Sequence, residues 1–184
     1  MNISAIRELS SLKDVLKDAN SIGVDPVYWV FSGVSKNKWE NITVLAPGNI
    51  GDEFTKTYGH YHSTQVNETY KVLSGEGLLI LQKKHFEGGV FIPEIIDEVK
   101  VIKGKAGEEF VITPEYGHSW SNVSDEPLVT LDDWKWGHKP EDYEHMKNFQ
   151  GMSYYVLKNG DSFVLEKNPK YKTLPEPQHC HPVL

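Results

Sequence analysis

Cysteine is almost missing from this 184-residue sequence, since Cys180 is the only one. A single cysteine excludes an internal disulfide framework, so the cytoplasm is the expected compartment. No apolar run approaches the roughly 20 residues that a membrane-spanning helix needs. The first residues also lack the apolar core of a signal peptide. We therefore expect a soluble intracellular protein.

Runs of basic residues are missing as well, and the formal net charge is −7. Nucleic acids are bound through clustered Lys and Arg, so a nucleic-acid partner is excluded. A small anion stays compatible with this composition, because a few backbone amides and hydroxyls can hold one phosphate. The hydrophobic fraction of 39% suits one buried core, and no repeat or linker interrupts residues 1–184. A single domain is predicted.

The beginning of the chain has the spacing of an amphipathic helix. Apolar residues recur at three- and four-residue steps, at Ile6, Leu9, Leu12, Val15 and Leu16. This is the period of one helical face. The pattern predicts a helix from about Ile6 to Lys17, within an N-terminal extension of residues 1–24.

Most of the remaining sequence is predicted to form short strands. The segments are rich in β-branched and aromatic residues and are bounded by Gly, Pro, Asn or Asp. They cover residues 27–34, 41–47, 59–62, 69–74, 77–84, 90–102, 108–114, 118–123 and 128–134. Such a series of strands with regular turns indicates a sandwich or a small barrel.

The C-terminal part is predicted to add a helix and a hairpin. Residues 139–149 favour a short helix, and residues 152–168 favour a hairpin that turns at Asn159-Gly160-Asp161. The proline-rich residues 172–184 are predicted to form a flexible tail. His179-Cys180-His181 in that tail can bind metal, and we interpret it as an exposed segment with adventitious affinity.

Two histidines that stand two residues apart carry the strongest chemical signal. Side chains alternate between the faces of a strand, so His60 and His62 point the same way and can share one ion. Glu68 follows on the next strand, and His118 comes from a distant strand after a proline turn. Three imidazoles and one carboxylate suit Fe2+, Mn2+, Ni2+ or Zn2+ and leave positions open for substrate oxygens. The alternative is a set of unrelated surface or core histidines.

The stretches around these residues resemble the two cupin motifs. Residues 59–77, GHYHSTQVNETYKVLSGEG, resemble the first motif, and residues 107–122, GEEFVITPEYGHSWSN, resemble the second. The resemblance implies an all-β fold, the cupin double-stranded β-helix barrel, with an N-terminal helix and a minor C-terminal helical turn.

Within the cupins, the chain is similar to the archaeal-type glucose-6-phosphate isomerases from about Asp25 to Tyr171. The match includes TVLAPG at residues 43–48 and a second motif of the form Pro-x-x-x-His, which ends at His118. The resemblance implies an isomerase that interconverts glucose 6-phosphate and fructose 6-phosphate in glycolysis and gluconeogenesis. It also implies a homodimer with one divalent ion per chain, Fe2+ first and Mn2+, Ni2+ or Zn2+ as the alternatives.

The resemblance further implies roles for individual residues. The metal ligands are His60, His62, Glu68 and His118, and the catalytic candidates are Glu68 and Tyr70. The groups around the substrate and its phosphate are Thr43, Thr57, Gly59, His138 and Tyr143, with Lys56 as a further possible donor. Thr57 and His60 are three residues apart, so in a regular strand their side chains would face opposite sides. A bulge near Gly59 is needed to bring both into one site.

Mechanism and substrate stay open at this point. Proton transfer by Glu68 through a cis-enediol and a hydride shift both fit the ligand set. Asp132-Asp133-Trp134 stands where the family carries a pocket tyrosine. An isomerase of another sugar, such as lyxose or mannose, and a non-catalytic cupin that binds sugar or metal are therefore the alternatives.

Several other titratable residues are interpreted without a chemical role. His85 and His145 are expected to be solvated surface residues, and Asp132 and Asp133 solvated carboxylates at a strand end. The ligand histidines must be neutral to bind metal, so activity is expected to fall on acidification towards a pKa of about 6.5.

Overall fold

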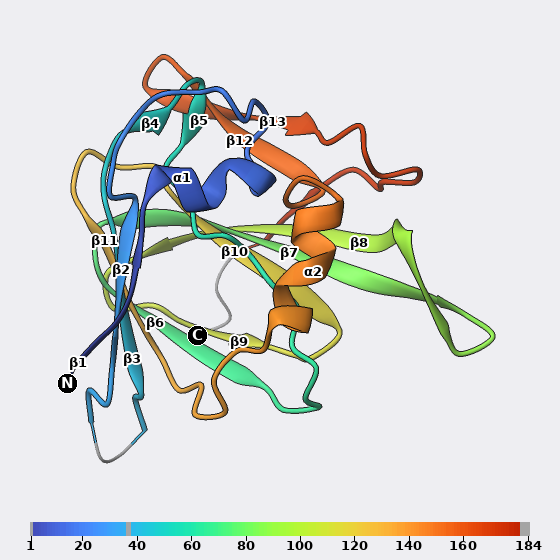
Figure 1. Cartoon of the computed structure of the whole chain (residues 1–184), viewed down its shortest axis with the longest axis horizontal. Coiled ribbons are helices and arrows are strands. Elements are labelled where there is room, and N and C mark those ends of the chain that lie inside the picture. The colour runs from blue at the N-terminus through green and yellow to red at the C-terminus, as the bar shows by residue number, and fades with distance from the viewer. Residues whose placement is uncertain (1, 36–37, 181–184) are drawn as a thin grey trace.

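The computed structural model describes residues 2–35 and 38–180, and strands make up most of its regular structure (Figure 1). The largest sheet has the order β1–β2–β3–β11–β6–β9, formed by Asn2–Arg7, Tyr28–Ser32, Asn41–Leu45, Leu128–Asp132, Glu68–Ser74 and Glu109–Ile112. A second sheet has the order β10–β7–β8–β14, formed by Tyr116–Asn122, Glu76–Glu87, Val90–Lys105 and Gln178–Cys180. A third has the order β13–β12–β5–β4, formed by Ser162–Lys167, Tyr154–Asn159, Glu53–Phe54 and Asn49–Ile50.

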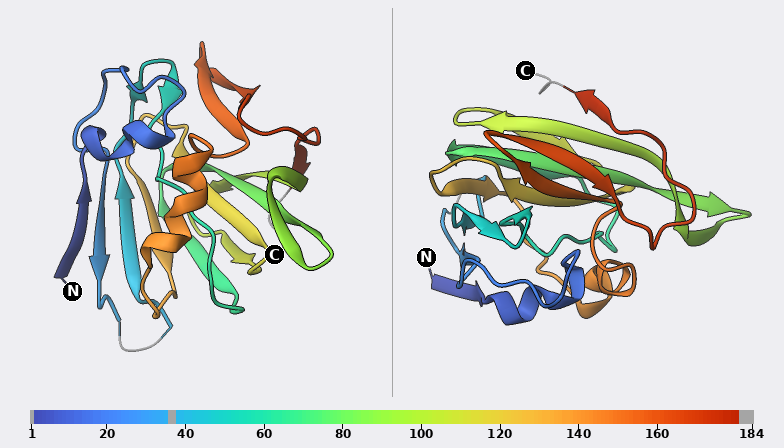
Figure 2. Two further views of the ribbon diagram at one scale, coloured as in Figure 1. Left: turned by 45° about the vertical axis from the view of Figure 1, so that its right-hand side comes forward. Right: turned by 90° about the horizontal axis from the view of Figure 1, so that it is seen from above.

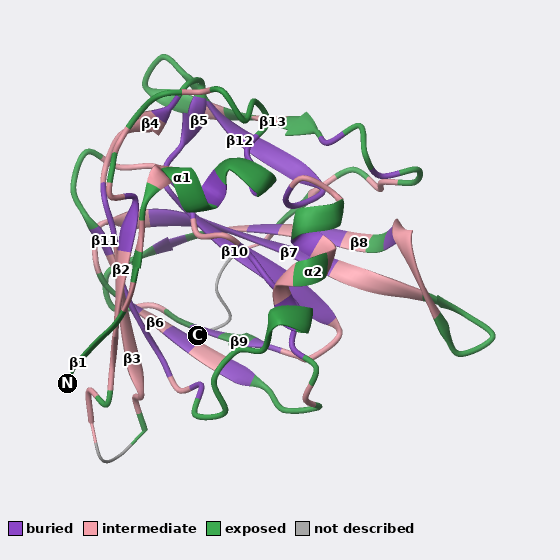
Figure 3. Cartoon of the chain, viewed as in Figure 1, coloured by how far each residue is buried: buried purple, intermediate pink, exposed green. Residues whose placement is uncertain are grey.

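The first two sheets enclose one hydrophobic core (Figures 2 and 3). Val72 of β6 and Leu79 of β7 are both fully buried, and every residue of β10 is buried. Burying one such aliphatic side chain contributes about 1.5–3 kcal/mol. Burial alternates along β6, as in a strand with one face on the core, whereas β7 is buried without a break from Gly77 to Gln82. The predicted all-β fold is confirmed.

The N-terminal segment differs from its prediction. Residues Asn2–Arg7 form β1, which pairs antiparallel with β2, and the helix α1 covers only Leu9–Leu12 before a 3-10 turn, η1, at Lys13–Val15. Ile6 is therefore a strand residue and is half exposed, at 51%. Hydrogen bonding to the sheet edge outweighs the local helical period here, because a short helix is marginal without tertiary packing.

The C-terminal helix and hairpin are confirmed. The helix α2 covers Pro140–Asn148, and β12 pairs with β13 around Gly160-Asp161. The prediction of a flexible tail is wrong in part, because Gln178–Cys180 forms β14, parallel to β8. The unpaired edge of β8 supplies the backbone partners that this polar segment could not reveal by its own pattern. His181 and the residues after it lie outside the described part of the chain.

The strands β7 and β8 form a long hairpin that extends beyond the barrel at the right of Figure 1. Gly88 and Gly89 link Glu87 to Val90, and both glycines have positive φ, 57° and 84°. A two-residue turn of that shape matches the twist of the flanking strands. No helix in the described residues is both long and apolar enough to cross a membrane.

Candidate metal centre

The two histidines of the HxH motif lie in an extended segment between β5 and β6 rather than in a regular strand. The His60 amide donates to the His118 carbonyl at 3.1 Å, and the His118 amide donates to the His60 carbonyl at 3.0 Å. This exchange fixes His60 beside the middle of β10. Glu68 is the first residue of β6. Four residues from three separate parts of the chain are thus brought to one place.

The expected bulge near Gly59 is confirmed. Lys56 pairs with Ser121 and His60 pairs with His118, so four residue steps on one side face three on the other. Gly59 has a φ of 79°, a conformation that residues with a Cβ rarely adopt. The extra residue lets Thr57 and His60 line the same cavity, although a regular strand would point them to opposite faces.

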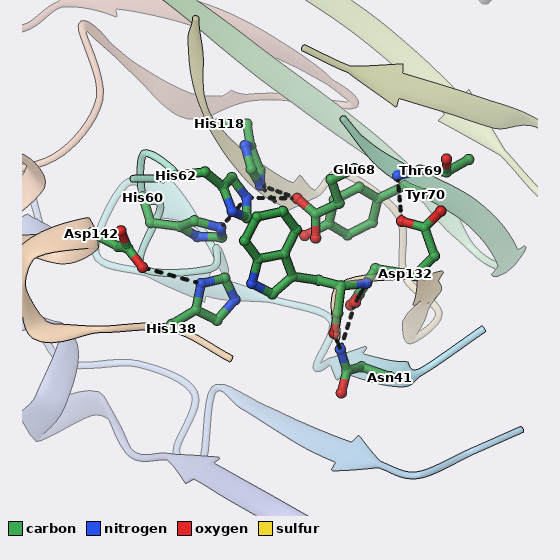
Figure 4. Close-up of polar contacts among 12 residues, drawn as sticks. Asn41, His60, His62, Glu68, Thr69, Tyr70, His118, Asp132, His138 and Asp142 are labelled. Atoms are coloured by element: carbon green, nitrogen blue, oxygen red, sulfur yellow. Dashed lines mark hydrogen bonds and ion pairs between the residues drawn. The ribbon is translucent and has the colours of Figure 1, made fainter. Parts of the chain in front are cut away.

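The four predicted metal ligands converge (Figure 4). One ligand atom from each of His60, His62, Glu68 and His118 lies within 4.8 Å of all the others. The Oε2 atom of Glu68 is 2.9 Å from Nε2 of His62 and 3.1 Å from Nε2 of His118. The Nε2 atoms of His60 and His62 are 3.1 Å apart. Donor atoms this close, on four separate side chains, match the requirement of a single small ion.

Burial strengthens the same conclusion. The four residues are between 1% and 9% exposed. Oε1 of Glu68 is buried and has no hydrogen-bond partner among the described residues. A buried carboxylate oxygen without a partner costs free energy that a bound cation would offset. The residues therefore fit a divalent metal, which would be held by the three imidazoles and Glu68.

Electrostatics keeps the cluster ready to bind a cation. Burial, followed by the charges of His118, His138 and His62, holds the pKa of His60 well below its usual 6.5. Burial alone would raise the pKa of Glu68, but the interactions with His118 and His62 outweigh it and lower that pKa to about 2. Metal ligands must be deprotonated, so the depressed pKa of His60 extends metal binding to a lower pH than an ordinary histidine would allow.

A cavity of about 430 Å³ opens over the cluster. This volume is in the range of small-molecule sites. It is lined by His60 and His118 together with every predicted substrate residue: Thr43, Thr57, Gly59, Tyr70, His138 and Tyr143. The hydroxyl of Tyr70 lies 3.5 Å from Nε2 of His118. The predicted substrate residues and metal ligands thus occupy one continuous site.

Lys56 does not belong to this site. Its Nζ is buried, is paired with Glu53 and donates to the carbonyl of Val15 at 2.6 Å. The suggestion that Lys56 could bind phosphate is therefore wrong. A buried ammonium needs a carboxylate partner, and Glu53 is close enough to supply it.

The Asp132 side chain corrects a second expectation. It is 6% exposed and lines the cavity, rather than standing in solvent at a strand end. Its Oδ1 accepts from Nδ2 of Asn41 at 2.6 Å and from the amide of Trp134 at 3.1 Å. Burial, followed by the charge of Glu68, raises the pKa of Asp132 to about 7, although the Asn41 hydrogen bond opposes the shift.

Two further residues, whose contacts with the centre the sequence did not predict, shape it. The Trp134 indole packs on the His62 ring, with centroids 3.6 Å apart. Asp142 accepts from the amides of Lys139 at 2.9 Å and Ser63 at 3.1 Å. It therefore caps helix α2 and ties that helix to the residue after His62. Both roles depend on contacts between distant segments, so no local pattern indicated them.

His145 is not a solvated surface residue. Its Nε2 lies 3.1 Å from the Tyr171 hydroxyl and its ring stacks on Phe149. Burial, followed by the charge of Lys84, lowers the pKa of His145 to about 4. His85 contacts Asp97 and Glu87 instead, and hydrogen bonds to these carboxylates raise its pKa.

The pKa of His145 predicts acid sensitivity of the metal-free protein. A folded pKa of about 4 lies below the unfolded value of 6.5, so only the unfolded chain takes up this proton as the pH falls between them. Stability should therefore be lost from about pH 6.5 down to pH 4, by about 1–3 kcal/mol for this group. Urea unfolding at several pH values measures it. His145→Phe keeps a packed ring, and its stability should fall less over this range; parallel curves for the two proteins would contradict the assignment.

The chain is similar in sequence to one family of known proteins. The family model described as glucose-6-phosphate isomerase matches residues 11–173. The glucose-6-phosphate isomerase of Thermococcus onnurineus is 29% identical over 177 residues, which cover 91% of this chain and 87% of that protein. The Pyrococcus furiosus protein of the same name is 30% identical over 154 residues, which cover 80% of this chain and 75% of that protein. Among solved structures, an oxalate decarboxylase of Lactobacillus farciminis has a TM-score of 0.42 at 18% identity, over 61% of this chain and 30% of that one.

Proposed function

The chain belongs to the glucose-6-phosphate isomerase family, and we propose that it interconverts glucose 6-phosphate and fructose 6-phosphate with one divalent ion held by His60, His62, Glu68 and His118. One observation carries this proposal: four buried ligand atoms lie within 4.8 Å of one another, beneath a cavity lined by hydroxyls and imidazoles. Fe2+ is the first candidate, and Mn2+, Ni2+ and Zn2+ are the alternatives for the same donor set.

Isomerisation moves hydrogen between C1 and C2 while the carbonyl and hydroxyl exchange places. The metal, when bound, supplies a Lewis acid that polarises the carbonyl oxygen. Glu68 has one oxygen, Oε1, without a hydrogen-bond partner, while Oε2 contacts two imidazoles. We assign Oε1 as the atom that accepts a proton in the enediol route. In a hydride shift Glu68 would act only as a ligand.

The cavity wall supplies the other groups that the reaction needs. Burial raises the pKa of Tyr70 well above its usual 10, so the phenol stays protonated and donates to a substrate oxygen. Asp132, with its pKa raised to about 7, can hold or release a proton near neutral pH. The Trp134 ring covers His62 and keeps water from that side of the centre.

A coupled assay tests the proposal. The protein is loaded anaerobically with each candidate metal and given fructose 6-phosphate, and glucose 6-phosphate formation is followed with a dehydrogenase. Turnover in D2O separates the two routes, because the enediol route exchanges the transferred hydrogen with solvent and the hydride shift keeps it. Absence of turnover with every metal would contradict the proposal.

A different sugar remains the second candidate, favoured by one observation. Asp132 occupies the cavity wall where the resemblance leads us to expect a tyrosine. A buried carboxyl there can accept hydrogen bonds from sugar hydroxyls that a phenol ring would exclude. Parallel assays with lyxose and mannose, each with and without phosphate, decide between these substrates.

We also propose that the protein is a homodimer. Exposed apolar side chains lie on the edge strand β1 and on the protruding β7–β8 hairpin: Ile3, Ile6, Phe86 and Val90 are 51–64% exposed. Such surfaces are found where proteins associate. Light scattering should give twice the chain mass of 20.9 kDa. A mass of one chain at working concentrations would contradict the dimer.

A further inference from the structure

Arg7 is the only arginine in the sequence, and the structure places it in the wall of the cavity. It is the last residue of β1 and pairs with Tyr28 of β2. Its side chain is half-buried, and it has no carboxylate partner within 4.0 Å among the residues that the structure describes. A guanidinium that is partly desolvated and has no counter-ion is ready to bind an anion.

Two tyrosines hold the guanidinium in place. Its Cζ lies over the Tyr143 ring, 5.8 Å from the centroid. Burial raises the pKa values of Tyr28 and Tyr143. The charge of Arg7 and its hydrogen bonds to the two hydroxyls lower these values by a smaller amount. Phenols that face a cation and remain protonated are themselves hydrogen-bond donors. Arg7, Tyr28 and Tyr143 therefore form a cluster of donors on one side of the cavity.

Within this cluster, Tyr143 is the member that contacts the metal centre. Its ring centroid is 5.7 Å from the centroid of the His60 ring and 5.8 Å from Cζ of Arg7. Thr43 and Thr57 line the same cavity. A substrate whose carbonyl end meets the metal ligands can thus present a charged group at its other end to Arg7.

The charges on this side of the cavity favour such a cation. The chain carries a formal net charge of −7 and Glu40 lines the cavity, so a phosphate dianion there gains from a nearby positive charge. Threonine and tyrosine hydroxyls offer hydrogen bonds but no charge. Lys135 is the other basic residue in the wall besides the histidines, and it is exposed, so salt screens its charge more than that of the half-buried Arg7.

We propose that Arg7 binds the phosphate group of the substrate and selects phosphorylated over unphosphorylated sugars. The guanidinium donates two parallel hydrogen bonds to phosphate oxygens, a geometry that lysine cannot reproduce. The N-terminal strand is then part of the substrate site rather than an extension of the barrel. The identity of the sugar rests on the proposed function, whereas the binding of a phosphate dianion does not.

The test begins with inorganic phosphate as the probe. Its affinity for the metal-loaded protein is measured by titration calorimetry for wild type, Arg7→Met, Arg7→Lys and the control Lys135→Met. A hydrogen bond to a charged group contributes about 1.5–3 kcal/mol, so Arg7→Met should weaken phosphate binding about 10- to 100-fold. Arg7→Lys should lose about 3- to 10-fold, and Lys135→Met less than about 3-fold.

Kinetics provide the second measurement. Arg7→Met should raise KM for fructose 6-phosphate by about 10- to 100-fold and change kcat by less than about 3-fold, because the contact is uniform binding. Thermal melting and metal content verify that the variant folds. If Arg7→Met does not fold, the loss of phosphate affinity in Arg7→Lys tests the proposal instead. Unchanged phosphate affinity and KM in a folded Arg7→Met protein, or an equal loss in Lys135→Met, would overturn the proposal.

The two proposals can fail separately. If wild type turns over no sugar phosphate but binds phosphate through Arg7, the isomerase proposal fails and the anion site stands. If folded Arg7→Met isomerises fructose 6-phosphate with an unchanged KM, the anion site fails and the isomerase stands.

Discussion

Replacing His118 with alanine is expected to remove the bound metal and to lower the turnover of fructose 6-phosphate by about 100-fold or more. Nε2 of His118 is 3.1 Å from Oε2 of Glu68, and His118 also fixes His60 through two backbone hydrogen bonds. Loss of a residue that merely supports a metal ligand already costs about 10- to 100-fold in affinity or activity, so loss of a ligand should cost at least as much. Elemental analysis and the coupled assay measure the two effects.

A matched control is available in His85. It is a histidine on β7 whose ion pairs, within the described residues, are with the carboxylates of Asp97 and Glu87. His85→Ala should keep both metal and activity, whereas His60→Ala should lose both. The backbone bonds between positions 60 and 118 do not need the imidazole, so His118→Ala should retain its circular dichroism spectrum. A folded His118→Ala protein with one metal per chain and normal turnover would refute the assignment of the centre.

Three of the four ligands could be predicted from sequence because their pattern is local. His60, His62 and Glu68 lie within nine residues, and alternation of side chains places the two imidazoles on one side even though the segment is only extended, not a regular strand. His118 is 50 residues away from Glu68, and its place after a proline turn, in a stretch that resembles the second cupin motif, indicated it. The bulge at Gly59 could be predicted because Thr57 and His60 were assigned to one site but are three residues apart, so a regular strand would point them to opposite faces.

The rest of the site could not be predicted in this way, because it depends on pairing between distant segments. Arg7 has the spacing of a helical residue, yet β1 pairs with β2 and turns its side chain into the cavity. Asp132 lies at the end of a strand, where its sequence context predicts a solvated carboxylate. In the structure, Asn41 of β3 and the Trp134 amide both donate hydrogen bonds to this carboxylate. Tertiary contacts overrode the local preference at both positions.

Removal of the metal with a chelator is expected to lower the melting temperature by about 5–10 °C and to abolish turnover, and both should return on reloading. An ion that binds only the folded chain contributes about 2.7 kcal/mol when it is present at 100 times its Kd, and each kcal/mol shifts the melting temperature of a chain of this length by about 2–4 °C. The Nε2 atoms of His60 and His62 face each other at 3.1 Å, and Oε1 of Glu68 has no hydrogen-bond partner in the part of the chain that the structure describes. A cation among them would be coordinated by the two Nε2 atoms and would offset the buried charge of Glu68. Scanning calorimetry with Fe2+, Mn2+, Ni2+ and Zn2+ measures the shift and ranks the metals.

Two variants separate this centre from the C-terminal segment that can also bind metal. His118→Ala should show no melting shift, because the centre has lost a ligand. Cys180→Ser should show the full shift, because Cys180 lies on β14 at the far edge of the second sheet from β10, which carries His118. The opposite result, a shift that survives in His118→Ala and disappears in Cys180→Ser, would mean that the ion is held by the tail. The buried cluster would then be a set of packed histidines, and the cavity above it would have no Lewis acid with which to isomerise a sugar.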